Sequence, residues 1–283
     1  MRRLNKKDNY IVDDLFTNES STYEDNIQDQ IEGIRSKGGR YRVKTIKSGN
    51  YLESEIYPIW DTSSSERRPK TKESRRAQRN LNNKNIIKKL IRLMNCNFTN
   101  DDILCTFTYD DRHLPKDMKK AQQDIVNYLR RLKTYVKKHN LPELKYIYVT
   151  EYNNQDEKKI RVHHHLVMNF YDRDVAEKYW KGGGRTQSKR LQHDEYGLEG
   201  LARYIMKDPK GTKRYTCSQN LKKPIVTVAD SKMTNAKVLK IIEHRIDAKD
   251  FFTKMYKGYD FNDMQLFFSD YVSGAYIRVR MKC

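Results

Sequence analysis

The sequence has few cysteines, no Cys-x-x-Cys pair and no long apolar run. Its 4 cysteines are scattered over 283 residues, which argues against a structural zinc site and against a dense disulfide framework. A reducing cytoplasm is the compartment that fits this cysteine usage best. No stretch approaches the roughly 18 apolar residues of a membrane span, and the basic N-terminus lacks the apolar core of a signal peptide. We therefore expect neither membrane insertion nor secretion.

Positive charge and tyrosine are what the sequence has in abundance. There are 57 Lys and Arg residues against 37 Asp and Glu residues, which gives a net charge of +20, and there are 20 tyrosines. Basic side chains neutralise phosphates, and aromatic side chains stack on bases. The composition therefore favours a nucleic-acid partner over a protein that is merely soluble and basic.

The distribution of polar and apolar residues divides the chain into four expected segments. Residues 1–40 are polar with little apolar periodicity, and we expect them to be flexible. Residues 41–100 combine a β-hairpin around Gly49, a basic linker and a short amphipathic helix. Residues 101–230 are expected to form the main folded domain, and residues 231–283 to add a helical segment and a late strand.

Two stretches of the chain concentrate positive charge. Between Arg67 and Arg79 there are seven basic residues and one acidic residue. A solvated linker and a phosphate-contacting arm explain this run about equally well. A second basic segment, residues 181–190, begins with a Lys-Gly-Gly-Gly-Arg sequence that is expected to be a flexible turn. Its glycines would let a DNA backbone approach closely, so both segments are candidates for contacting phosphates.

Apolar periodicity in the middle of the chain predicts strands and helices. Three β-rich runs occur at residues 103–109, 145–152 and 160–169, and an amphipathic helical pattern covers residues 118–136. The last two runs are separated by a seven-residue polar loop, so they should pair antiparallel. Further helices are expected over residues 198–207 and 231–246. We therefore expect the α+β class, with an antiparallel central sheet flanked by helices.

Three consecutive histidines lie in the third of these strands. Because side chains alternate along a strand, His163 and His165 point to one face and His164 points to the other. His164 shares its face with apolar neighbours, which indicates a packing role. His163 and His165 lie side by side on the more polar face, where two imidazoles can share one cation.

Glu151, near the end of the preceding strand, is the candidate third ligand. If odd-numbered residues pair with odd-numbered residues, Glu151 lies beside His163 or Arg161, whereas a slip of one residue puts it on the opposite face. Two imidazoles and a carboxylate leave coordination positions open, which suits Mg²⁺ or Mn²⁺ bridging to a phosphate oxygen. Histidines that are simply exposed or paired with Glu151 are the alternative, but the clustering favours a metal.

A Tyr-x-x-Lys motif supplies candidates for a nucleophile, because helical spacing places the phenol and the ammonium on adjacent surface positions. A phenol with a pKa near ~10 is a weak nucleophile unless a cation or metal stabilises its anion. Tyr41 is expected in a strand and Tyr135 beside an apolar stripe. Tyr204 falls at the edge of the apolar stripe of a short helix and can line a site that Lys207 reaches, although an ordinary surface tyrosine is the alternative. The motif occurs three times, at Tyr41/Lys44, Tyr135/Lys138 and Tyr204/Lys207.

The order of these features resembles the HUH superfamily of single-strand endonucleases, specifically the rolling-circle replication initiators of plasmids, phages and small circular DNA viruses. The resemblance covers roughly residues 103–230, so the segment 101–230 is the expected nicking domain. His164 departs from the family's usual His-hydrophobe-His pattern, and the absence of a second tyrosine four residues after Tyr204 indicates a single-tyrosine enzyme. Three motifs carry the resemblance in sequence order: the strand Cys105–Tyr109, the pair His163 and His165, and the run Tyr204, Lys207 and Asp208.

The resemblance implies a metal-dependent, site-specific endonuclease and strand transferase that acts on single-stranded origin DNA. Glu151, His163 and His165 would hold Mn²⁺ or Mg²⁺, and Tyr204 would form a 5′-phosphotyrosine link while Lys207 steadies the developing charge. It also implies a bacterial host cytoplasm. Host helicase and polymerase are expected partners, because the sequence has no GxxxxGK[ST] loop.

Other functions remain open from the sequence. Within the same chemistry, a conjugative relaxase or a single-strand transposase is possible. The alternative from another class is a non-catalytic single-stranded nucleic-acid-binding protein. Such a protein would explain the net charge of +20 and the tyrosines, but it gives no reason for a face prepared for a metal.

Overall fold

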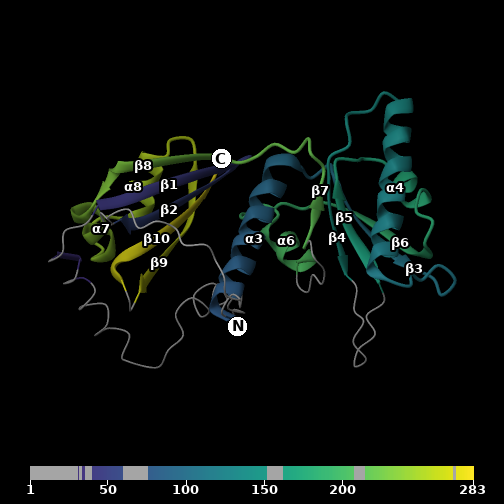
Figure 1. Cartoon of the computed structure of the whole chain (residues 1–283). Helices are drawn as coiled ribbons and strands as arrows, with labels where there is room; N and C mark the ends of the chain where they lie inside the picture. The colour runs from purple at the N-terminus through teal and green to yellow at the C-terminus, as the bar shows by residue number, and fades with distance from the viewer. Residues whose placement is uncertain are drawn as a thin grey trace, which may run out of the picture. The chain divides into compact units, whose positions relative to one another are not determined.

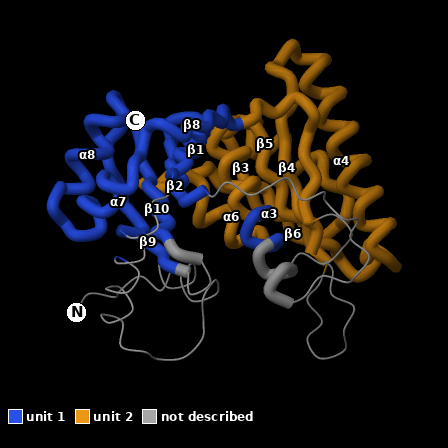
Figure 2. Tube along the Cα trace, turned by 60° about the vertical axis from the view of Figure 1, so that its left-hand side comes forward, with its two compact units in different colours: residues 1–86, 224–283 blue, residues 87–223 orange. Residues whose placement is uncertain are grey.

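The computed structural model describes residue 31 and residues 34–35, 40–59, 76–151, 162–206, 214–269 and 272–283. The chain divides into two compact units, one of residues 1–86 with 224–283 and the other of residues 87–223 (Figure 2). Each unit contains a five-stranded antiparallel sheet. The predicted α+β class, with antiparallel strands flanked by helices, is therefore confirmed, although the sequence indicated a single central sheet. Most of residues 1–40 and of the basic run 67–79 lie outside the described residues.

The sheet of the unit 87–223 has the strand order β6-β3-β5-β4-β7 (Figure 1). The histidine strand β5 lies at its centre and pairs antiparallel with β3 on one side and β4 on the other. β-branched and aromatic residues fill these inner strands, as the sequence predicts. The strands are β3 (Ile103–Tyr109), β4 (Tyr146–Glu151), β5 (His163–Met168), β6 (Gly183–Arg190) and β7 (Thr216–Cys217).

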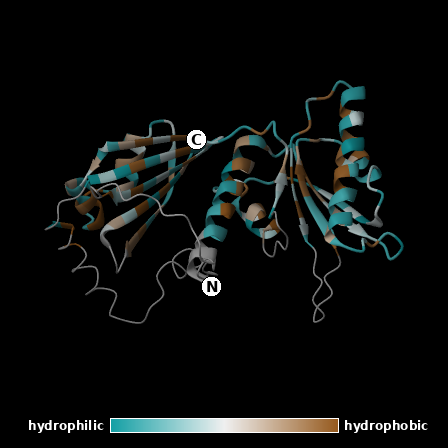
Figure 3. Cartoon of the chain, viewed as in Figure 1, coloured by the Kyte–Doolittle hydropathy of each residue, from teal (hydrophilic) through white to brown (hydrophobic). Residues whose placement is uncertain are grey.

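Helix α4 (Met118–Lys138) covers one face of this sheet. It begins at Asp117, whose side chain accepts a hydrogen bond from the Lys120 main-chain N–H at 2.7 Å. Its apolar stripe is buried in the core of the unit, and its other side is hydrophilic (Figure 3). The Phe107 ring stacks on Trp180 in that core, at a centroid distance of 4.9 Å. The short helix α5 (Arg173–Lys178) packs near β6 and adds the buried Ala176 to the same core.

Helix α6 (Glu199–Ile205) carries Tyr204, and its start is fixed by the C-terminal part of helix α3 (Arg76–Asn97). The Leu198 main-chain N–H donates a hydrogen bond to Asn95 Oδ1 at 2.9 Å. This contact depends on Gly197, which has a φ of 73° and sits so close that a Cβ would lie 2.5 Å from the same oxygen. A buried asparagine and a glycine therefore set where α6 begins.

The other unit is built on a sheet of order β8-β1-β2-β10-β9. The expected hairpin is confirmed as β1 and β2, which pair antiparallel and turn at Gly49 with a φ of 61°. Helices α7 (Asn235–Ile242) and α8 (Ala248–Met255) pack on this sheet, and Ile31 and Ile34 are buried in the same core. The strands are β1 (Arg40–Ser48), β2 (Tyr51–Ile59), β8 (Ile225–Thr234), β9 (Asp260–Ser269) and β10 (Val272–Lys282).

Two local predictions are wrong. The glycine run expected to be a flexible turn enters strand β6 at Gly183, because Gly184 lets β6 approach β3 so closely that a Cβ would lie 2.5 Å from the Tyr109 carbonyl carbon. The helix expected over residues 231–246 is shorter, because the chain up to Thr234 belongs to strand β8. Pairing with β1 therefore overrides the local helical pattern.

Candidate metal centre and nucleophile

Glu151, His163 and His165 come together on one face of the sheet. Glu151 is the cross-strand partner of His163, so odd-numbered residues pair with odd-numbered residues. The carboxylate oxygens of Glu151 lie 3.2 Å from His163 Nε2 and 3.7 Å from His165 Nε2. One ligand atom from each residue lies within 4.8 Å of the other two. Two imidazole nitrogens and a carboxylate oxygen at this spacing fit a divalent metal with open coordination positions.

The two histidines are held in different ring orientations. Their ring centroids are 4.9 Å apart and the ring planes are 89° apart. His165 Nδ1 lies 3.2 Å from Thr106 Oγ1 on strand β3. If Nδ1 carries the proton, Thr106 accepts it and the lone pair of Nε2 faces Glu151, which is the tautomer that a metal at Nε2 requires. Thr106 therefore supports the position of a candidate ligand.

Burial keeps His165 neutral. Loss of solvent, reinforced by the neighbouring His163, lowers the pKa of His165 to about 4, while the Glu151 carboxylate opposes the shift. At neutral pH its imidazole is therefore uncharged. An uncharged imidazole has a free lone pair, so His165 can bind a cation without first losing a proton.

His164 points to the opposite face, as alternation along the strand predicts. It is 0% exposed and makes two hydrogen-bonding contacts of 2.8 Å, from Nε2 to Tyr109 Oη and from Nδ1 to Thr150 Oγ1. Burial lowers its pKa to about 3, so it is neutral inside the core. Both ring nitrogens have partners, and His164 therefore occupies a polar packing position behind the candidate metal centre.

Tyr204 lies beside this centre. Its ring centroid is 5.3 Å from that of His165, with the planes 65° apart, and 59% of the residue remains exposed. Leu198, Ala202 and Ile205 are buried, so Tyr204 stands at the edge of the apolar stripe of α6 as the sequence indicated. The other member of its motif, Lys207, lies outside the described residues, as does Asp208.

The other two Tyr-x-x-Lys motifs do not approach the histidines. Tyr41 is 1% exposed, and its hydroxyl accepts a hydrogen bond from the Ala275 main-chain N–H in the core of the unit 1–86 with 224–283. Tyr135 packs against the core on the α4 side and stacks near His139, at a centroid distance of 4.1 Å. Among the three candidates, the structure brings only Tyr204 to the metal face.

Sequence reasoning missed Thr106 and Asn95. Thr106 alternates with the buried residues of β3, so its placement on the histidine face could have been found from the same periodicity. Its partner could not, because the pairing of β3 with β5 joins residues 59 positions apart. Asn95 gives no local signal, since it reaches α6 over a separation of 103 residues.

We expect Thr106→Val to weaken metal binding by about 10- to 100-fold, because His165 loses the partner that fixes its ring orientation and tautomer. Isothermal titration with Mn²⁺ measures this change. Thr108→Val is the matched control, because the Thr108 hydroxyl donates to the Arg185 carbonyl instead of contacting a histidine. Equal Mn²⁺ affinity in Thr106→Val and the original protein would show that Thr106 does not support the centre.

The fold and the site together define an α+β domain with a His-x-His pair and a carboxylate on adjacent antiparallel strands, next to a helical tyrosine. Residues 102–210 match the family model of the replication-associated protein ORF2. The resemblance to the HUH-type replication initiators is confirmed by this match and by the His-His-Glu cluster. It indicates a replication-associated role. No curated protein and no solved structure matches the chain.

The match covers both the histidine strand and α6, so the family assignment rests on the segment that forms the site. It covers less than half of the chain and ends before strand β7. Within the described residues, no helix is both long and apolar enough to cross a membrane.

Proposed function

We propose that the protein is a rolling-circle replication initiator that nicks single-stranded origin DNA through a tyrosine–DNA intermediate and later rejoins the strands. The observation that carries this proposal is the position of Tyr204, whose ring lies 5.3 Å from that of His165 in a cluster that can bind a divalent metal. Replication-associated proteins provide the family context for residues 102–210. Tyr204 is exposed and therefore accessible to a large substrate.

In the proposed reaction, Tyr204 Oη attacks the phosphorus of the scissile phosphodiester. A new Oη–P bond forms, the bond between phosphorus and the 3′-oxygen breaks, and that oxygen leaves with a proton as a free 3′-hydroxyl. The phenol proton is released to solvent or to a base. The 5′ side of the nick remains attached to the enzyme, and the 3′-hydroxyl can prime DNA synthesis.

Each candidate residue has a distinct role in this proposal. A divalent metal bound by Glu151, His163 and His165 supplies a Lewis acid that polarises the phosphate and favours the phenolate. Thr106 holds the His165 ring, and α6 holds Tyr204 beside it. Lys207 is proposed to steady negative charge on the phenolate or on the phosphorus oxygens.

The covalent intermediate makes rejoining possible without an external energy source. The phosphotyrosine bond retains the energy of the phosphodiester, so a later DNA 3′-hydroxyl can attack it and release Tyr204. Unwinding and synthesis are proposed to depend on host helicase and polymerase.

Strand β6 offers a path for the DNA across the metal face. Its residue Gln187 is the cross-strand partner of Thr106, which is in turn the partner of His165. Arg185 and Lys189 alternate with the less exposed residues of β6, so they share the face of Gln187 and are exposed. We propose that these two cations bind phosphates of the strand on its way to the centre.

Replacing both Arg185 and Lys189 by Ala should weaken single-stranded DNA binding and flatten its salt dependence. Each lost phosphate contact removes about 0.7 from the slope of log affinity against log salt. Fluorescence anisotropy over a salt series measures the slope. Lys119→Ala/Lys137→Ala removes the same charge from the exposed side of α4 and should leave the slope nearly unchanged. An unchanged slope in the β6 variant would remove these residues from the footprint.

The proposed function is tested by incubating the protein with the element's own origin strand, or with random pools of single-stranded DNA, in the presence of Mn²⁺. We expect a protein–DNA adduct that survives a denaturing gel, and its loss when EDTA replaces Mn²⁺. Tight binding without an adduct on the true origin strand would overturn the nuclease proposal and favour a non-catalytic binding protein.

A further inference from the structure

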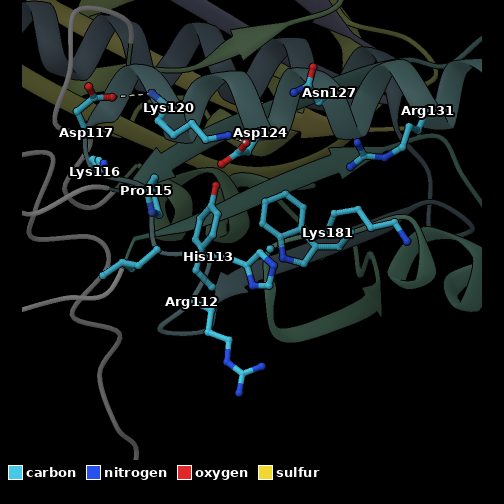
Figure 4. A pocket seen from close by; sticks show the side chains of 14 residues that line it. Arg112, His113, Pro115, Lys116, Asp117, Lys120, Asp124, Asn127, Arg131 and Lys181 are labelled. Atoms are coloured by element: carbon cyan, nitrogen blue, oxygen red, sulfur yellow. Dashed lines mark hydrogen bonds and ion pairs between the residues drawn. The ribbon is translucent and has the colours of Figure 1, made fainter.

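A pocket lies on the opposite face of the sheet from the candidate metal centre. It has a volume of about 510 Å³ and is formed by the loop after β3, the first half of α4 and the turn before β6 (Figure 4). This volume falls within the range of small-ligand sites. Nothing in the proposed nicking reaction uses it.

Cationic side chains outnumber carboxylates in the lining of the pocket. The two acidic residues are already engaged, since Asp117 caps α4 and Asp124 pairs with Lys120 Nζ at 2.6 Å. Figure 4 shows Arg131 and Lys181 at one end of the pocket and Lys116 at the other. The cationic residues that line it are Arg112, Lys116, Lys120, Arg131 and Lys181.

The pocket also offers apolar and ring surfaces. Tyr109 and Trp180 form its buried floor, with ring centroids 5.2 Å apart. Leu114 exposes 45% of its surface at the lip, which is unusual for a leucine. The His113 ring lies among the lining side chains and is oriented by Asp110, whose Oδ1 is 2.6 Å from His113 Nδ1. A base can pack against these groups while the cations hold its phosphate.

The pocket is directly connected to the back of the metal centre. Its floor residue Tyr109 contacts His164, which lies between the two candidate ligands His163 and His165 in strand β5. Tyr109 is also the last residue of β3, and its neighbour Thr108 is the cross-strand partner of His163. The pocket and the centre therefore lie at the same end of the sheet, on opposite faces.

We propose that this pocket binds a nucleotide of the DNA strand that the protein processes, outside the segment that lies at the centre. This inference rests on the proposed function for the identity of the strand. The basic segment gives it a continuous route, since Lys181 lies in the pocket while Arg185, four residues later, is on the metal face. A strand that passes round this end of the sheet would be held on both faces.

Photocrosslinking of single-stranded DNA that contains 5-iodouracil tests the proposal. The Tyr204→Phe protein is used, so that the strand is bound without being cut. We expect crosslinks to the peptide that contains His113 and Leu114. Arg112→Ala/Lys181→Ala should reduce this crosslink and weaken DNA binding about tenfold at 0.1 M salt, because two phosphate contacts are lost. The charge-matched Lys119→Ala/Lys137→Ala variant should retain both.

The outcomes separate the pocket from the nuclease proposal. Crosslinks confined to β6 and α6, with unchanged affinity in Arg112→Ala/Lys181→Ala, would overturn the pocket while leaving the nicking reaction in place. Binding of dTMP that protects the pocket, without any strand crosslink there, would assign it to free nucleotides and also overturn the proposal. The nicking reaction is judged independently, from adduct formation by the unaltered protein with Mn²⁺.

Discussion

Tyr204→Phe should reduce formation of the protein–DNA adduct by about a thousandfold or more, because the substitution removes the only atom of the side chain that can bond to phosphorus. The ring is retained, so its edge contact with His165 is preserved and the fold is left intact. Adduct yield on a denaturing gel measures the effect. Binding of the same strand, measured by anisotropy, should change by less than about tenfold, since the hydroxyl is one of many contacts.

Tyr135→Phe provides the matched control, because it removes a phenolic hydroxyl from the other helical Tyr-x-x-Lys motif of the same unit. We expect full adduct yield from it. An adduct that persists in Tyr204→Phe would keep the enzymatic function and reject Tyr204 as the nucleophile. Peptide mapping of that adduct would then identify the residue responsible.

Glu151→Gln should weaken Mn²⁺ binding by about a hundredfold or more, because the amide keeps the shape of the side chain but removes the negative charge and one ligand oxygen. The consequence is measurable as stability. At a concentration of one hundred times its Kd, Mn²⁺ should stabilise the original protein by about 2.7 kcal/mol, and at the same concentration it should stabilise the variant by about 0.4 kcal/mol. Thermal unfolding with and without Mn²⁺ measures this difference.

The control for this variant is Glu143→Gln, which neutralises an exposed glutamate just before strand β4. It should retain the full stabilisation by Mn²⁺, and its adduct yield should be unchanged. If Glu151→Gln binds Mn²⁺ as tightly as the original protein, the cluster of Glu151 with His163 and His165 is a hydrogen-bonded group and not a metal centre.

Local periodicity was sufficient to divide the histidine strand into two faces. Alternation separates His164 from His163 and His165, and the structure confirms the consequence, since His164 is 0% exposed and bonded within the core. The short polar loop similarly predicted the antiparallel pairing of β4 with β5. The register was left open because sequence alone did not exclude a slip of one residue.

The choice among the three tyrosine motifs depended on packing over long distances. All three have the same local spacing, yet Tyr41 enters one core, Tyr135 borders another and Tyr204 approaches His165. The position of Tyr204 depends on Asn95, which fixes the start of α6 from a helix about a hundred residues earlier. No local pattern encodes such a contact.

The sequence by itself determined the nucleic-acid character of the protein, the α+β class and the face on which His163 and His165 lie, because charge, composition and side-chain alternation are properties of the chain alone. Tertiary structure decided the pairing of Glu151 with His163, the approach of Tyr204 and the second sheet. That sheet joins β1 and β2 to strands that follow residue 223. Such pairings depend on which distant strands meet and in what register, and this is set by the packing of the whole unit.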